Sequence, residues 1–146
     1  MKASDNMVLH SVDSSNSFFR SKLMTAETEE FWVAALDSGC RVISATMLFK
    51  GTVNYCLFHP RDILRYAVLQ NAVYIIVAHN HPSNLCLPSR RDIQHTRILF
   101  HLCQLIQIPL ADHLIITNDE VYSFAQSTHF AKWKKEKNLS LLLSGE

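Results

Sequence analysis

Four side chains that can bind a metal ion or assist hydrolysis lie within fourteen residues of this 146-residue chain: His79, His81, Ser89 and Asp92. Two histidines at positions i and i+2 of an extended segment point to the same side, because side chains alternate along a strand. A catalytic zinc ion takes three nitrogen or oxygen ligands and keeps a fourth position for water. The spacing therefore indicates a site for one zinc ion, with His79, His81 and Asp92 as its ligands.

The segments around these residues are expected to bring them together. The apolar run at 74–78 predicts a buried central strand that delivers His79 at its carboxyl end. Ligand sites of open α/β sheets tend to lie just beyond such strand ends. Ser89, three residues before Asp92, is close to the capping pattern of a helix start, and the first turn can carry Asp92 back toward the imidazoles. The alternative is that the histidines are structural and that Ser89 only caps a helix.

Turn signals and apolar periodicity divide the rest of the chain into interleaved strands and helices. The expected strands cover residues 30–36, 41–50, 53–58, 73–78, 110–117 and 120–124. The expected helices cover residues 17–24, 60–71 and 89–106. This order predicts a single domain of the α/β or α+β class.

Composition and charge limit the class of protein. With 48% hydrophobic residues the chain can bury one core, and a net charge of +1 gives no support for binding nucleic acid. No apolar stretch is long enough to span a bilayer, and the start lacks a secretory pattern. The four scattered cysteines are typical of a reducing cytoplasm. We therefore expect a cytoplasmic protein without membrane partners. Cys86 is an alternative metal ligand, because it lies between His81 and Ser89.

The spacing of the candidate ligands resembles a known motif. The order His-x-His-Pro, six residues, Ser, two residues, Asp is the metal motif of the Jab/MPN (JAMM) metallopeptidase family. The flanking residues resemble the bacterial RadC-like branch of that family, whose name implies DNA repair. The resemblance covers about residues 22–126, and the matching positions are 51–52, 59–61, 79–83, 88–89, 92, 96, 112–116 and 123–124.

This resemblance implies a fold and a reaction. The fold is a mixed β-sheet flanked by helices, like that of the cytidine deaminases, within residues 22–126. The reaction is hydrolysis of a peptide or isopeptide bond by water that a zinc ion activates. Residues 1–21 are then expected to form a flexible N-terminal arm. Residues 127–146 are expected to form a basic tail, with its lysines on a solvated helix face.

A hydrolytic site also needs a base that takes a proton from the attacking water. The resemblance implies a glutamate from an early strand, and the Glu-x-Phe pattern of the RadC-like branch selects Glu29. Glu30 is the alternative, because neighbouring side chains of a strand point to opposite faces. The resemblance also implies that Ser89 stabilises the oxyanion of a tetrahedral intermediate, a role that does not exclude capping the helix.

Other polar residues of the matched region have less specific expectations. Asn80 should face away from the metal, and His113 is read as a packing residue or a contact behind a metal ligand. Asn84 stands where the family usually has glycine, and asparagine tolerates left-handed backbone better than most residues. The other histidines are expected to be structural or exposed: His10, His59, His95, His101 and His129.

Two functions from different classes follow from these observations. The first is a metal-dependent hydrolase that acts on a peptide or protein substrate. Zinc is expected, although two imidazoles and one carboxylate also suit iron. The second is a RadC-like accessory protein with little or no catalysis, acting through partner binding in DNA repair or a mobile element. A nucleobase deaminase is excluded because the His-x-Glu and Pro-Cys-x-x-Cys motifs are absent. An HNH-type nuclease would spread its residues over a longer unit.

Overall fold

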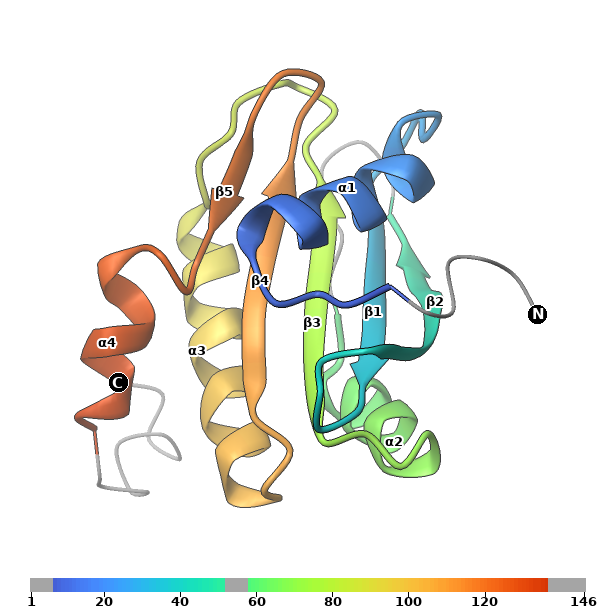
Figure 1. Ribbon diagram of the computed structural model, residues 1–146. Coiled ribbons are helices and arrows are strands. Elements are labelled where there is room, and N and C mark those ends of the chain that lie inside the picture. The colour runs from blue at the N-terminus through green and yellow to red at the C-terminus, as the bar shows by residue number, and fades with distance from the viewer. Residues whose placement is uncertain (1–6, 52–57, 137–146) are drawn as a thin grey trace.

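The computed structural model describes residues 7–51 and 58–136, and a five-stranded β-sheet forms its centre (Figure 1). The strands are β1 (Glu30–Leu36), β2 (Val42–Lys50), β3 (Tyr74–Asn80), β4 (Leu110–Ile116) and β5 (Val121–Ser123). Their order across the sheet is β2-β1-β3-β4-β5. β3 and β4 are parallel, and the other neighbouring strands are antiparallel. The sheet is therefore mixed, as predicted.

Helices cover both faces of this sheet. The described helices are α1 (Val12–Leu23), α2 (Pro60–Leu69), α3 (Arg90–Leu105) and α4 (Thr128–Lys134). Residues of α1 belong to one core cluster, and residues of α2, α3 and α4 belong to the cluster on the opposite face (Figure 1). The prediction of an α+β domain with a mixed sheet flanked by helices is confirmed.

The central strands β1 and β3 are buried on both faces, so their side chains alternate between the two core clusters. Val33 and Val77 contact the cluster that contains α3, whereas Ala34 and Ile76 contact the cluster that contains α1. His79 follows Val77 in this alternation. The sheet therefore presents His79 to the face that α3 covers, at the carboxyl end of β3.

Helix α1 corrects the expectation of a flexible arm over residues 1–21. It begins before the predicted helix start, and Ser11 and Ser14 form a capping box at its N-terminus. Phe18 and Phe19 are buried against the sheet. The polar composition of this segment favoured a loose arm. Composition could not show the burial of the two phenylalanines, because that burial depends on a sheet formed by later residues. The first six residues lie outside the described part of the chain.

Arg20 joins α1 to the turn between β4 and β5. Its guanidinium donates to the backbone oxygens of Thr117, Asn118 and Glu120 at 2.6, 3.0 and 3.0 Å. Hydrogen bonds from a charged donor are stronger than neutral ones. Helix α1 is therefore fixed to the end of the sheet at which β3 delivers His79.

Helix α4 corrects part of the expectation that residues 127–146 form a basic tail. Phe130 and Trp133 of α4 are buried and contact the ring of Phe100 on α3, with centroids 4.9 and 5.8 Å away. The lysines of α4 are exposed, as predicted for a solvated helix face. The segment is thus part of the packed domain up to its described end at Glu136, and residues 137–146 lie outside the description.

Two predicted strands near the site need comment. Residues 53–57 of a predicted strand lie outside the described part, and Phe58 is not in a strand. β3 continues to Asn80, past the predicted end, and therefore includes His79. No helix within residues 7–51 and 58–136 is long and apolar enough to cross a membrane.

Truncating Phe19 tests whether α1 is part of the folded domain. Phe19 is 0% exposed, so Phe19→Ala should lower the free energy of unfolding by about 3–5 kcal/mol. Met24, at the end of the same helix, is 70% exposed, and Met24→Ala should change it by less than about 0.5 kcal/mol. Urea denaturation followed by circular dichroism measures both. Equal effects of the two variants on the free energy of unfolding would support the predicted flexible arm.

Candidate metal centre

The two histidines of the motif face each other at the end of β3. Their Nε2 atoms are 3.0 Å apart. Two imidazole nitrogens bound to one tetrahedral zinc at ordinary bond lengths would lie roughly 3.3 Å apart. His79 is buried and His81 is half-buried, so the pair opens toward the surface through His81. The imidazoles are therefore already spaced to share one ion.

Asp92 reaches this pair from the first turn of α3. Its Oδ1 lies 3.6 Å from Nε2 of His79, and its Oδ2 lies 3.3 Å from Nε2 of His81. Ser89 fixes the turn, because its hydroxyl accepts from the Asp92 N–H at 3.0 Å and its own N–H donates to Asp92 Oδ2 at 2.9 Å. The structure thus brings together the three predicted ligands, which are a donor set that suits zinc.

Glu29 approaches the same centre from the position directly before β1. Its Oε1 is 4.0 Å from Nε2 of His81, and ligand atoms of Glu29, His79 and His81 all lie within 4.8 Å of one another. Asp92 lies closer to the imidazoles than Glu29 does, and either carboxylate can reach an ion held by the two histidines. Glu30 is turned away, because its Oε1 accepts from the indole N–H of Trp32 at 3.1 Å. The geometry therefore favours Glu29 over Glu30.

Asn80 fixes the backbone on both sides of Glu29. Its Oδ1 accepts from the backbone N–H of Glu30 at 2.7 Å, and its Nδ2 donates to the backbone oxygen of Thr28 at 3.0 Å. Asn80 itself follows His79 on β3. One strand end thus supplies a metal ligand and also positions the candidate base, an effect that sequence reasoning missed.

His113 supports His79 from behind. His79 Nδ1 and His113 Nε2 are 2.8 Å apart, and His113 Nδ1 and Thr96 Oγ1 are 2.7 Å apart. When Nε2 of His79 binds a metal, its Nδ1–H donates to His113, which in turn donates from Nδ1 to Thr96. Burial, and then the charge of His79, hold the pKa of His113 well below its usual range. A neutral His113 therefore fixes the orientation of His79.

Hydrogen bonds and charges control the protonation of the other ligands. Burial lowers the pKa of His81, but hydrogen bonds to Asp92 and Leu85, together with the charges of Asp92 and Glu29, outweigh it and raise the pKa overall. Burial would raise the pKa of Asp92, but hydrogen bonds from His79 and His81 hold it far below its usual range. Asp92 is therefore ionised near neutral pH, as a metal ligand must be.

The loop between His81 and Ser89 is held by its own contacts. Asn84 has a φ of +63°, in the left-handed region. Asparagine adopts this backbone conformation more readily than most residues, so it can replace the glycine that the family usually has here. The Oδ1 of Asn84 also accepts from the backbone N–H of Asn118 at 3.2 Å, a bond that glycine could not form. The backbone oxygen of Leu85 lies 2.9 Å from His81 Nδ1 and can accept its proton, which leaves Nε2 for the ion.

Cys86 is directed elsewhere. Its thiol donates to the backbone oxygen of Ile115 at 3.5 Å. Burial raises the pKa of the thiol, whereas a metal binds the thiolate. The alternative that Cys86 is a ligand is therefore disfavoured.

Comparison with known proteins identifies the family. A family model described as the RadC-like JAB domain matches residues 9–129. The chain belongs to this family. The matched range includes α1, which places that helix within the family domain and agrees with its packing on the sheet. The RadC-like Jab/MPN resemblance that the motif indicated is confirmed.

The chain is also similar to the UPF0758 protein Reut_A2732 of Cupriavidus pinatubonensis (strain JMP 134 / LMG 1197). The two are 41% identical over 110 residues, which are 75% of this chain and 48% of the relative. The chain thus spans about half the length of the curated relative that it matches.

Removing the contact behind His79 should weaken metal binding. His113→Ala leaves the Nδ1–H of His79 without its acceptor, and zinc affinity should fall about 10–100-fold. Competition with a chromophoric chelator measures this affinity. His10 is exposed, and His10→Ala should leave the affinity within about twofold of wild type. An unchanged affinity in a folded His113→Ala variant would contradict the assigned contact.

Zinc affinity should fall as the pH decreases, because protons and the ion compete for the same imidazole nitrogens. The raised pKa of His81 moves the onset of this loss above the pH at which an ordinary histidine titrates. Below that pKa the affinity should fall at least about tenfold per pH unit. The same chelator competition, with circular dichroism as the control for folding, measures the profile. A flat profile from neutral to mildly acidic pH would exclude histidine ligation.

Proposed function

We propose that this domain is a zinc-dependent hydrolase that cleaves a peptide or isopeptide bond in a peptide or protein substrate. The observation that supports it is the convergence of His79, His81 and Asp92, with the carboxylate of Glu29 beside them. Membership of the RadC-like JAB domain family adds support. A buried metal site with an unligated carboxylate alongside is an arrangement suited to hydrolysis.

Each residue has a role that its position allows. His79, His81 and Asp92 would hold the ion, which when bound lowers the pKa of water and polarises a carbonyl oxygen. Glu29 accepts the proton of the attacking water and then donates it to the leaving amine. Ser89, at the exposed start of α3, donates a hydrogen bond to the carbonyl oxygen as negative charge develops there.

Metal content and hydrolysis separate the ligands from the base. Purified wild-type protein should carry about one equivalent of zinc, and His79→Ala and Asp92→Ala should lose it. Glu29→Gln should keep the metal and lose about 10²–10⁴-fold in cleavage rate, since only proton transfer is removed. Glu30→Gln is the matched control, because Glu30 is turned toward Trp32, and it should retain both. Elemental analysis and mass spectrometry of a digested-proteome peptide library measure the two properties.

Several outcomes would oppose this function. Metal retained in the wild type, with no cleavage of any peptide or isopeptide-linked substrate, would favour the accessory role in DNA repair or a mobile element. Iron in place of zinc in the elemental analysis would correct the identity of the ion, since the donor set suits both. Loss of activity in Glu30→Gln with full activity in Glu29→Gln would transfer the role of base to Glu30.

A further inference from the structure

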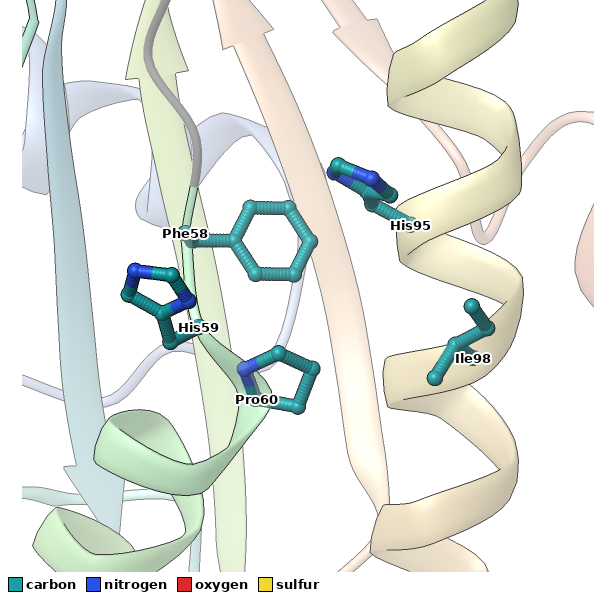
Figure 2. Close-up of a pocket in the computed structure, with 5 residues that line it drawn as sticks. All are labelled: Phe58, His59, Pro60, His95 and Ile98. Carbon is teal, nitrogen blue, oxygen red and sulfur yellow. The ribbon is translucent and has the colours of Figure 1, made fainter.

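A cavity of about 340 Å³ opens beside the candidate metal centre, between the start of α2 and one face of α3 (Figure 2). Ligand pockets of proteins range over roughly 300–1,000 Å³, so this one is small. Its size suits one large side chain with its adjoining backbone better than a cofactor. The described residues that line it are Phe58, His59, Pro60, His95 and Ile98.

The inner wall of the cavity is joined to the metal centre by stacked rings. The ring of Phe58 stacks on Phe31, with centroids 4.6 Å apart. Phe31 in turn stacks on the imidazole of His79, with centroids 6.1 Å apart. The edge of Phe58 also meets His113, which supports His79 from behind, at 6.4 Å. The cavity and the metal centre therefore share one wall of aromatic rings.

Helix α3 carries one residue of each site. His95 lines the cavity and follows Asp92 by three residues, which is about 4.5 Å along a helix axis. An extended peptide advances about 3.3 Å per residue. A substrate with its carbonyl group at the metal centre would thus place a side chain in the cavity one or two residues from the cleaved bond.

The chemistry of the lining selects the kind of side chain. Phe58, Pro60 and Ile98 present carbon atoms, and the described part of the lining contains no acidic side chain, lysine or arginine. Burial, and then the charge of Arg91, lower the pKa of His95, so its imidazole is neutral at pH 7. A charged side chain would lose hydration against these carbon atoms, a cost that an apolar side chain does not have.

His95 and Phe58 also form one aromatic wall of the cavity. Their rings are in edge-to-face contact at 80°, with centroids 5.5 Å apart, and Figure 2 shows the imidazole of His95 next to the ring of Phe58. Ile98 projects from α3 below His95, on the same side of the cavity, and lies across from Pro60 (Figure 2). Edge-to-face and offset stacked contacts with rings of this kind favour an aromatic guest.

We propose that this cavity binds an apolar side chain of the substrate, preferably an aromatic one, within two residues of the bond cleaved at the metal centre. The inference rests on the proposed hydrolase function for the identity of its occupant. Binding of the side chain itself requires no catalysis, so the two proposals can be tested apart.

The binding test uses two neutral probes, N-acetylphenylalaninamide and N-acetylasparaginamide, titrated to their solubility limits. The phenylalanine amide should shift the ring C–H signals of His95 in NMR spectra of the wild-type protein, and the asparagine amide should not. Ile98→Trp fills the cavity and should weaken binding at least tenfold. The matched control is Ile106→Trp, at a residue 37% exposed beyond the end of α3, which should bind within twofold of wild type.

Each outcome decides the proposal. Equal shifts with both amides, no shift of His95, or undiminished binding in Ile98→Trp would overturn it. If circular dichroism shows that Ile98→Trp does not fold, Ile98→Asn replaces it, since a polar side chain at this half-buried position should also weaken binding of the apolar probe.

The cleavage profile then separates the two proposals. In the digested-proteome library, wild-type protein should prefer large apolar residues within two positions of the cleaved bond, and Ile98→Trp should lose this preference while keeping its zinc. Cleavage without any such preference overturns the cavity assignment and leaves the hydrolase intact. Binding of the phenylalanine amide without cleavage of any peptide overturns the hydrolase and leaves an apolar binding site.

Discussion

The carboxylate of Asp92 holds the start of a helix and faces two imidazoles, and the candidate centre depends on this double contact. It accepts the N–H of Ser89 at 2.9 Å, while its two oxygens lie 3.6 Å from His79 and 3.3 Å from His81. A carboxylate is favoured at a helix N-terminus, where the helix dipole is positive. Because the capping box fixes this side chain before any ion binds, little conformational entropy remains to be lost on binding.

The pairing of neighbouring strands positions the other side chains of the candidate centre. Parallel pairing of β3 with β4 sets His113 opposite Val77, from where its side chain reaches His79. Antiparallel pairing of β3 with β1 brings the start of β1 to the same end of the sheet, where Asn80 holds the backbone on both sides of Glu29. A site supported from several elements keeps its geometry during a reaction, which is the condition for electrostatic preorganisation.

A wall of aromatic rings extends from the candidate metal centre to the cavity. Phe31 lies between His79 and Phe58, so the packing that orients the metal ligand also shapes the cavity beside it. The exposed Leu85 and Leu87 lie in the loop that follows His81, and they add apolar surface near the centre. Such a combination of a polar centre with apolar surroundings is typical of ligand-binding sites.

Local sequence determined much of this site, because a strand end, a loop and a helix cap within one short segment carry His79, His81 and Asp92. The strands and helices also follow from periodicity, and most lie close to their predicted bounds. The Glu-x-Phe pattern favoured Glu29 over Glu30, but only the side-chain contacts of the folded chain give the physical reason. Local sequence could not show that α1 packs on the sheet, or that a cavity adjoins the metal centre. Those features require residues far apart in the chain to share buried surface, and the tertiary structure alone decides which surfaces meet.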